Sequence, residues 1–246
     1  PFNNKHLNLA LDIGNSFLKA GIFKNNNLIN YYEFNREYYS NIKSILDKTP
    51  ITHSIASNVS ESNNKLIELL SNKTNLIKFN SSLKVPFKNC YQTKNTLGKD
   101  RIALVSNASK EYPKENVLLI DLGSCITFDF LNSKNEYLGG SISPGLSMRY
   151  KSLNSYTANL PLINPKEIDY FIGRNTEDSI HSGIINGIVG ELNSAIDKYK
   201  SQFKEIRIIL TGGDSKFLFN RIKNSIFANS NFLILGLNFL IELNKK

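Results

Sequence analysis

The sequence predicts an α/β protein made of two similar half-domains. Apolar segments typical of buried strands alternate with segments of helical periodicity along most of the 246 residues. One pattern occurs twice, in LALDIGNSFLKAGIF at 9–23 and in VLLIDLGSCITFDFL at 117–131. Each copy has an apolar strand that ends in an acid, followed by a glycine, a small polar residue and a second apolar strand. A separation of about 110 residues is too long for a solenoid unit and indicates two duplicated lobes.

The elements of the first lobe alternate in the same way. We expect a strand at LINYYEF, a helix near 37–47, a strand at HSIASNV, a short helix at NNKLIELLSNK and a strand at LIKF. Segment 81–100 has little periodicity, so it is expected to be a long loop, which in a compact protein is often functional. A helix is expected to begin near Arg101 and to stop near Pro113, where PKEN links the lobes. We place the lobes at 1–114 and 115–246.

The second lobe continues after its own hairpin. EYLGGSISPGLSMRYKSL predicts a strand, a Gly-Pro-Gly turn region and a helix. NTEDSIHSGIINGIVGELNSAIDKYK predicts a long helix that a capping Asn or Thr opens, with acids in its first turn. IRIILTGGDS predicts a buried strand that ends in two glycines, and NFLILGLNFLIEL a closing amphipathic helix.

Composition narrows the classes of partner. The formal net charge is +9, which favours anionic ligands. The lysines are dispersed through Asn-rich and Ser-rich segments without a dense basic stripe, so no nucleic-acid partner is expected. Hydrophobic residues make up 41% of the chain, yet no apolar run has membrane-spanning length and the N-terminus lacks a secretory signal. We therefore expect a cytoplasmic protein without a membrane partner.

Cysteine and histidine give no sign of a transition-metal site. Cys90 and Cys125 lack CxxC spacing and have no histidine nearby at ligand spacing, so neither is expected to bind zinc or to form a disulfide. His6, His53 and His181 are scattered and are expected to be structural or on the surface. Any metal chemistry would belong to carboxylates and hard cations.

The two acid-tipped hairpins allow two interpretations. Asp12 and Asp121 stand at strand ends, where a plain turn would also explain an acid followed by a glycine. Alternatively, the tight turn at Gly14 leaves backbone N–H groups facing a phosphate, while Asp12 holds a metal ion and Lys19 projects from the second strand. Two such hairpins facing a cleft would suit the phosphates and the metal of a nucleotide.

Two further segments could carry chemistry. In LGKDRIAL, Gly98, Asp100 and Arg101 could simply form a helix N-terminus, or they could place a base beside an arginine that binds a carboxylate or phosphate. In LTGGDS, Gly212 and Gly213 could form a plain turn, or they could let a flat ligand ring approach the backbone.

Together these segments resemble one family along essentially the whole chain. The sequence is similar to type III pantothenate kinase in seven motifs at matching separations, which are DIGNSFLK (12–19), GKDR (98–101), DLGSCIT (121–127), GGSISPG (139–145), TANLP (157–161), GRNT (173–176) and LTGGD (210–214). The resemblance implies two duplicated ribonuclease-H-like, actin-like ATPase lobes with ATP in the cleft between them, working as a homodimer. It also implies ATP-dependent phosphorylation of the primary hydroxyl of pantothenate, the first step of coenzyme A biosynthesis.

The resemblance assigns a role to each matching residue. It implies Asp100 as the base, Asp12 as the carboxylate that places Mg²⁺, and Asp121 as the ligand of a monovalent cation, K⁺ or NH₄⁺. Pantothenate would be bound by Tyr91, Gly98, Lys99, Asp100, Arg101 and Thr176. ATP would be bound by Asp12, Gly14, Asn15, Ser16, Lys19, Ser124, Gly212 and Gly213.

Three departures and two rival functions accompany this interpretation. Ser124 stands where the family usually has threonine, Cys125 where it usually has a small residue, and SFLK at 16–19 where a polar pair is more typical after the amide; none of these changes removes a reacting group. One rival is a catalytically silent, nucleotide-binding regulatory relative, which the positive charge would favour. The other is a kinase or phosphatase of the same fold that acts on a sugar, acetate or polyphosphate.

Overall fold

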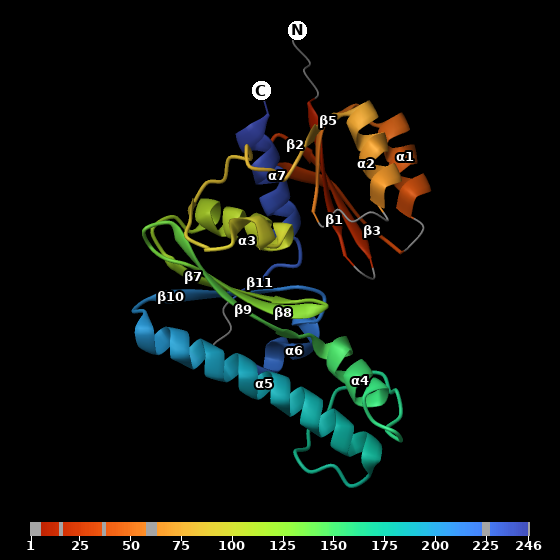
Figure 1. Ribbon diagram of the computed structural model, residues 1–246, viewed down its shortest axis with the longest axis vertical. Helices are drawn as coiled ribbons and strands as arrows, with labels where there is room; N and C mark the ends of the chain where they lie inside the picture. Colours follow the sequence, from red (N-terminus) through yellow and green to blue (C-terminus); the bar gives the residue numbers. More distant parts are fainter. Residues whose placement is uncertain (1–5, 15–16, 36–37, 58–62, 223–226, 246) are drawn as a thin grey trace. The chain divides into compact units, whose positions relative to one another are not determined.

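A computed structural model describes residues 6–14, 17–35, 38–57, 63–222 and 227–245 (Figure 1). The chain forms two compact units, Pro1–Pro113 with Asn231–Lys246, and Lys114–Ser230. The sequence assigned the closing segment to the second lobe, and this assignment is corrected, because that segment packs within the first unit. A helical period shows which face of a helix is apolar but not which sheet covers it.

The first unit has one sheet with helices on both faces. Its strands lie in the order β3-β2-β1-β4-β5, with β1 antiparallel to β2 and parallel to β4. Its elements are β1 (Leu7–Ile13), β2 (Leu18–Lys24), β3 (Asn27–Phe34), α1 (Tyr38–Lys48), β4 (Ile51–Ala56), α2 (Asn64–Lys73), β5 (Asn75–Ile77), β6 (Lys88–Asn89), the 3₁₀ turn η2 (Lys94–Thr96), α3 (Lys99–Glu111) and α7 (Phe232–Asn244).

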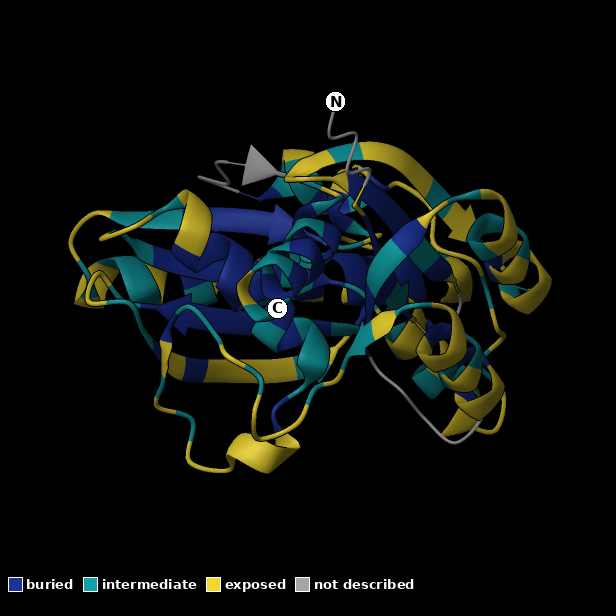
Figure 2. Ribbon diagram, turned by 90° about the horizontal axis from the view of Figure 1, so that it is seen from above, coloured by how far each residue is buried: buried dark blue, intermediate teal, exposed yellow. Residues whose placement is uncertain are grey.

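Alternation along the central strand β1 builds two cores. Leu9 and Leu11 point to one face of the sheet, where α1 and α2 cover them. Ala10 points to the other face and packs against α3 and α7. The strand is therefore buried on both sides, and Figure 2 shows several strands of the protein in the dark blue of buried residues. A strand buried in this way can only present a polar side chain at its ends.

A polar contact and a close approach attach α7 to the first unit. The amide of Asn8, buried on β1, donates to Asn238 Oδ1 at 2.8 Å and to Glu242 Oε1 at 2.7 Å. Gly236 faces α3 so closely that a Cβ there would lie 1.9 Å from the carbonyl oxygen of Ala103. The missing side chain is what lets the two helices approach.

The second unit repeats the topology of the first. Its strands lie in the order β9-β8-β7-β10-β11, with β7 antiparallel to β8 and parallel to β10. The predicted duplication is thereby confirmed. Its elements are β7 (Asn116–Leu122), β8 (Cys125–Leu131), β9 (Glu136–Pro144), α4 (Leu146–Ser155), α5 (Thr176–Gln202), β10 (Ile206–Thr211), α6 (Ser215–Leu218), the 3₁₀ turn η3 (Phe219–Arg221) and β11 (Phe227–Ala228).

The long helix α5 supplies the core of the second unit. It runs along one face of the sheet (Figure 1), and Ile184, Ile188 and Leu192 pack on Leu118 and Ile120 of β7. These helical residues recur every four positions, which gives α5 one continuous apolar face. Within the described residues, no helix combines the length and the apolar character needed to cross a membrane.

Several smaller expectations can be compared with the structure. Cys90 and Cys125 are both free thiols, as expected. Segment 81–100 is largely irregular and contains only β6, η2 and the start of α3 as regular structure. The helix expected to begin near residue 37 is α1, and residue 37 itself lies outside the described residues.

The packing of α7 on α3 predicts that Gly236→Ala destabilises the protein by about 1–3 kcal/mol, because the new methyl group overlaps backbone that cannot move freely. Urea unfolding measures this change. Gly190→Ala is the matched control, since a Cβ at this helical position meets no atom within 4 Å. There the substitution should stabilise by about 0.5–1 kcal/mol, the usual gain of alanine over glycine in a helix. Equal unfolding midpoints for both variants would contradict the packing argument.

Candidate active site

The first hairpin presents Asp12 at the edge of the sheet where the parallel strand β4 also ends. Ser57, the residue after β4, donates its backbone N–H to the carbonyl of Leu11 at 2.9 Å. Its hydroxyl donates to Asp12 Oδ1 at 2.7 Å and accepts the N–H of Ile13 at 3.2 Å. Two strand ends thus fix the orientation of one carboxylate.

The surroundings of Asp12 leave its negative charge incompletely compensated. Burial raises the pKa of Asp12 above its ordinary value, the Ser57 hydrogen bond and the charge of Lys19 lower it, and the charge of Asp100 raises it again. Lys19 stands directly opposite Asp12 on β2. Because the net shift is upward, a cation bound beside this carboxylate would be stabilised.

The turn after Asp12 is tight. Gly14 donates its N–H to the carbonyl of Phe17 at 2.9 Å, and a Cβ on Gly14 would lie 3.0 Å from the same oxygen. Glycine therefore suits this position sterically. Asn15 and Ser16, predicted ATP contacts, lie outside the described residues.

The N-terminus of α3 holds the proposed base. Gly98 caps the helix, and a Cβ there would lie 2.4 Å from Asp100 Oδ1, so glycine makes room for this carboxylate. Asp100 Oδ1 accepts the N–H of Arg101 at 2.9 Å. The carboxylate is half-buried at a helix N-terminus, where the helix dipole favours a negative charge. The charge of Asp100 is also the smallest of the four influences on the pKa of Asp12, and both acids belong to the first unit.

Two cationic side chains beside Asp100 pack on aromatic rings. The guanidinium of Arg101, buried with 4% of the residue exposed, lies 5.6 Å from the ring centroid of Tyr91. Lys99 Nζ lies 6.0 Å from the ring centroid of Phe79. The sequence predicted that all three of Tyr91, Arg101 and Asp100 contact the substrate. In the structure Tyr91 packs on Arg101, which directly follows Asp100 in the chain.

The second hairpin presents Asp121 in the same way. Its partners in register are Thr127 on β8 and Thr211 on β10. Gly212 comes next with a φ of +93°, and a Cβ there would lie 2.4 Å from Asp121 Oδ1 and 2.5 Å from the backbone of Leu122. Only glycine lets this turn lie directly against the carboxylate.

A second glycine turn contacts the same hairpin. Gly145, between β9 and α4, donates its N–H to the carbonyl of Ser124 at 3.2 Å. A Cβ on Gly145 would lie 2.3 Å from the carbonyl oxygen of Gly123 and 2.5 Å from that of Ser124. The backbone of the predicted ATP contact Ser124 therefore rests on the GGSISPG segment.

The LTGGD turn makes one further backbone contact. The N–H of Asp214 donates to the carbonyl of Leu122 at 3.0 Å, which ties the turn to the hairpin. Burial raises the pKa of Asp214. At Gly213 an added Cβ would meet no atom within 4 Å, so packing inside the protein gives no reason for glycine at this predicted ATP contact.

Thr176 is the first residue of α5, and its neighbours fix the start of that helix. Asn175 is the cap, as the sequence allowed, with its side-chain oxygen accepting the N–H of Asp178 at 2.8 Å. The Asp178 carboxylate accepts Tyr170 OH at 2.7 Å and Lys166 Nζ at 3.1 Å. These two bonds hold the preceding loop on the helix.

The acids at the two strand ends, Asp12 and Asp121, offer oxygen ligands, which hard cations prefer. Among the described residues, no group of three or more His, Cys, Asp or Glu side chains could hold a metal ion. Each acid, in its own unit, could supply one oxygen ligand to a cation whose other ligands are phosphate oxygens and water. Mg²⁺ bound to a nucleotide is held in this way, by one or two carboxylates plus the phosphates.

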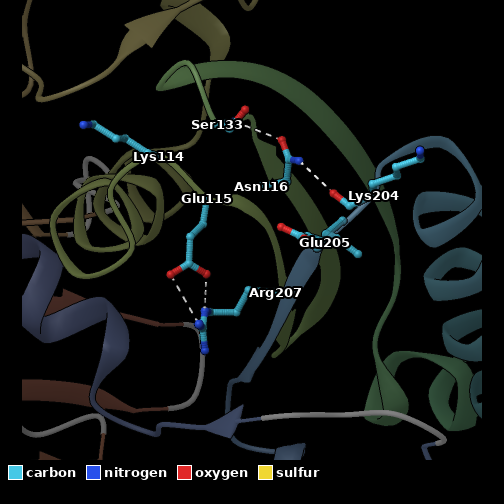
Figure 3. Close-up of a pocket in the computed structure, with 8 residues that line it drawn as sticks. Lys114, Glu115, Asn116, Ser133, Lys204, Glu205 and Arg207 are labelled. Carbon is cyan, nitrogen blue, oxygen red and sulfur yellow. Dashed lines mark hydrogen bonds and ion pairs between the residues drawn. The ribbon is translucent and has the colours of Figure 1, made fainter.

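A pocket of about 530 Å³ lies elsewhere in the second unit (Figure 3). It is at the start of β7 and β10, the opposite end of these strands from the acid-tipped hairpin. Several of its polar groups are paired with one another: Glu115 with Arg207 at 2.7 Å, and Asn116 with the N–H of Ser133 and the carbonyl of Lys204. We do not place the active site there, because the pocket contains none of the predicted site residues.

Two positions around the hairpins were not predicted as site residues. Ser57 supports Asp12, and a signal existed, because parallel strands end at the same sheet edge and the small polar residue after β4 therefore lies beside the acid. Gly145 lies in a quoted motif, but its contact with Ser124 depends on tertiary packing that no local pattern reveals.

Comparison with solved structures agrees with this description. A protein of Campylobacter jejuni, described as a candidate Baf family transcriptional activator, is 25% identical with a TM-score of 0.61, over 96% of this chain and 98% of its own. A candidate N-acetylmannosamine kinase from Listeria monocytogenes is 13% identical with a TM-score of 0.55, over 97% and 100%, which shows the fold alone. The duplicated fold, with an acid at the end of each central strand, belongs to the actin-like class of folds.

Sequence comparison identifies the family within that class. The model of type III pantothenate kinase matches residues 8–198. The relative named type III pantothenate kinase in Christiangramia forsetii is 49% identical over 97% of this chain and 99% of its own length, and that of Flavobacterium johnsoniae is 42% identical over 94% and 95%. The chain belongs to the type III pantothenate kinase family, and its reaction is a phosphoryl transfer from ATP.

The raised pKa of Asp12 predicts that Asp12→Asn stabilises the protein at neutral pH. An acid whose folded-state pKa is raised favours folding when protonated, and this contribution is lost as the pH rises through the folded pKa. Asparagine keeps the acceptor for Ser57 and removes the buried charge, so we expect a gain on the order of 1 kcal/mol in urea unfolding at pH 7.

The gain should shrink as the pH falls toward the ordinary pKa of aspartate, because the wild-type carboxyl becomes neutral there. Asp47→Asn is the control: it removes an exposed acid paired with Lys73 at 3.1 Å and should change stability by less than about 0.5 kcal/mol. A loss of stability in Asp12→Asn at pH 7 would rule out this account of the charge.

Proposed function

We propose the residues by which this chain carries out the ATP-dependent phosphorylation of pantothenate, the first step of coenzyme A biosynthesis. Asp100 accepts the proton of the primary hydroxyl of pantothenate as that oxygen attacks the γ-phosphorus of ATP. Its placement supports this role: the carboxylate is half-buried, Gly98 leaves room for it, and the Arg101 N–H fixes its rotamer. Phosphoryl transfer has a loose transition state, so a carboxylate needs only to align the hydroxyl.

Arg101 and Tyr91 bind the other end of pantothenate. A guanidinium offers a planar pair of donors that matches a carboxylate, which an ammonium cannot do. The position of Arg101 beside the Tyr91 ring orients that plane. The proposed substrate contacts are completed by Gly98, Lys99 and Thr176. Asn175 and Asp178 support the position of Thr176.

The first hairpin binds the phosphates of ATP. Asp12, held by Ser57, carries an incompletely compensated charge, which supports a divalent cation there, and Lys19 adds positive charge opposite. Mg²⁺ in this position would neutralise charge on the phosphate oxygens. Gly14, Asn15 and Ser16, which follow Asp12 and Ile13 in the sequence, complete the proposed phosphate contacts.

The second hairpin binds the remainder of the nucleotide and a monovalent cation. Asp121 lies between two threonines and against the Gly212 backbone, an oxygen-rich setting that suits K⁺ or NH₄⁺. Such an ion would add positive charge close to the phosphates. Ser124 contacts ATP through its hydroxyl, and the LTGGD turn, with Gly212 and Gly213, lets the nucleotide approach the backbone.

The placement of Asp100 at the N-terminus of α3, beside Arg101 and the Tyr91 ring, is the observation that carries this proposal. The Campylobacter jejuni relative is described as a regulator, which keeps a silent nucleotide-binding role as the second candidate. The charge of Asp100 raises the pKa of Asp12, so the two negative charges interact unfavourably. A catalytically silent protein would gain nothing from this unfavourable interaction.

We further propose a homodimer that works in the cytoplasm. Large apolar side chains are exposed in one segment just before Thr176, namely Tyr156, Leu162, Phe171 and Ile172, the last two with 79% and 76% of each residue exposed. Such a patch in a protein marks an interaction surface. A second copy of this chain is the occupant we assign, and it would lie close to the proposed substrate contact.

The role of Asp100 predicts that Asp100→Asn lowers kcat by about 10²–10⁴-fold, the usual effect of removing a general base. The assay follows ATP-dependent phosphorylation of pantothenate with Mg²⁺, in the presence and absence of K⁺ or NH₄⁺. Wild-type turnover should rise with the monovalent cation. Near-normal turnover of a folded Asp100→Asn variant would remove Asp100 from this role, and a wild-type enzyme indifferent to both ions would remove the monovalent site.

The proposed dimer predicts that the double substitution Phe171→Ser with Ile172→Ser yields monomers in sedimentation velocity experiments, whereas the wild type sediments as a dimer. The variant loses apolar surface at the interface, which weakens association. Ile29→Ser is the control, because Ile29 is also exposed, at 47%, but lies on the edge strand β3 of the first unit. A double variant that remains dimeric would place the interface elsewhere.

A further inference from the structure

Glu191 lies near the middle of α5, about four helical turns beyond Thr176. Its two carboxylate oxygens have different partners. Oε1 accepts the hydroxyl of Ser143 at 2.5 Å, and Oε2 forms an ion pair with the guanidinium of Arg149. One helical carboxylate thus contacts both the end of β9 and the first turn of α4.

Arg149 makes the second set of contacts with the turn between β9 and α4. We call Glu191 and Arg149, with their bonds to this turn, the bracket. Its Nε donates to the carbonyl of Pro144 at 2.9 Å while its terminal nitrogen is paired with Glu191. Its backbone N–H donates to the carbonyl of Gly145 at 3.1 Å. Glu191 therefore holds Ser143 directly and Pro144 through the side chain of Arg149, at the residues that immediately precede Gly145.

The turn inside this bracket is the one that contacts the second hairpin. Gly145 bonds to the carbonyl of Ser124, and the surrounding space is so small that even a methyl group on Gly145 would overlap two carbonyl oxygens. Packing at this density transmits displacements instead of absorbing them. A shift of the turn would move the backbone that carries the hydroxyl of Ser124.

We propose that Glu191 and Arg149 are positioning residues for the nucleotide: they hold Gly145 against Ser124 and so set the geometry of ATP binding without touching ATP. This inference rests on the proposed ATP contact of Ser124. The bracket reaches only the hairpin of the second unit, so its loss should weaken ATP binding and leave pantothenate binding unchanged.

A merely structural ion pair would behave differently, and the chain contains a suitable comparison. Glu115 and Arg207 form another Arg–Glu pair in the same unit, at 2.7 Å, with side chains 41% and 36% exposed against 31% and 21% for Glu191 and Arg149. Both pairs join segments distant in sequence. The Glu115 pair lies in the pocket of Figure 3, at the opposite end of the strands from the hairpin.

The test compares Glu191→Gln with Glu115→Gln in the full-length enzyme. Glutamine keeps an acceptor for one neighbour but removes the charge that pairs with arginine. We expect Glu191→Gln to raise both the KM for ATP and the calorimetric Kd for ATP by about tenfold, because small displacements of a binding group are costly. Its KM for pantothenate should change by less than about twofold. Glu115→Gln should leave all three constants at the wild-type values.

A second variant tests whether weaker ATP binding in Glu191→Gln could result from misfolding of that variant. Arg149→Lys retains the positive charge but cannot donate to both Pro144 and Glu191, so it should raise the Kd for ATP in the same direction. Glu191→Gln and Glu115→Gln should lower the melting temperature by similar, small amounts. A difference in ATP binding between the two variants would then reflect positioning of the nucleotide contact and not a loss of stability. Equal effects of the two glutamine variants on ATP binding, or none in either Glu191→Gln or Arg149→Lys, would overturn the inference.

Ser124→Ala distinguishes this inference from the function on which it rests. If Ser124→Ala weakens ATP binding and Glu191→Gln does not, then only the positioning role fails. If the Kd for ATP is unchanged in Ser124→Ala, the proposed nucleotide contact itself fails, and the positioning role fails with it.

Discussion

The site of the second unit depends on one constraint. Two backbone segments, one on each side, must lie directly against the hairpin of β7 and β8, with no side chain in between. Gly212 approaches the Asp121 carboxylate, and Gly145 approaches the carbonyls of Gly123 and Ser124. At both positions a Cβ would come within 2.5 Å of an existing atom. Packing against the hairpin therefore explains the glycine at position 212 of the LTGGD motif and at position 145 of the GGSISPG motif, whether or not these motifs also contact a nucleotide.

In the first unit the corresponding constraint is electrostatic. Asp12 is buried enough that its pKa rises, even though Ser57 and Lys19 both favour its ionised form. Placing Asp100 nearby adds to the cost. A fold selected for stability alone would have a neutral residue at the end of β1, so the arrangement is the kind of local conflict that marks functional sites. A bound cation would resolve it.

Periodicity and repetition made the duplicated fold predictable from the sequence, whereas features that depend on tertiary contacts were missed. The two copies of the hairpin indicated the duplication because strand, acid and glycine are all local features. The location of α7 was not predictable in this way: its apolar character shows that it is buried, but the contacts that locate it, Asn8 with Asn238 and Gly236 with Ala103, join residues more than 130 positions apart. The support of Asp12 by Ser57 likewise required the register of β1 and β4.

The duplication would also explain how one repeated backbone could bind the two proposed cations. Asp12 and Asp121 occupy equivalent strand ends, each between an antiparallel and a parallel neighbour. The antiparallel neighbour places Lys19 opposite the first acid and Thr127 opposite the second.

On the parallel side, Ser57 donates its hydroxyl to Asp12, whereas Thr211, opposite Asp121, donates its own to the carbonyl of Asn229. The first carboxylate thus shares its charge with an ammonium and a hydroxyl, as would suit the proposed site for phosphates and a divalent ion. In the second unit, threonines stand in register on both sides of Asp121, where the first unit has a lysine and a serine. The difference between the proposed Mg²⁺ and K⁺ or NH₄⁺ sites therefore reduces to side chains at equivalent positions of one repeated fold.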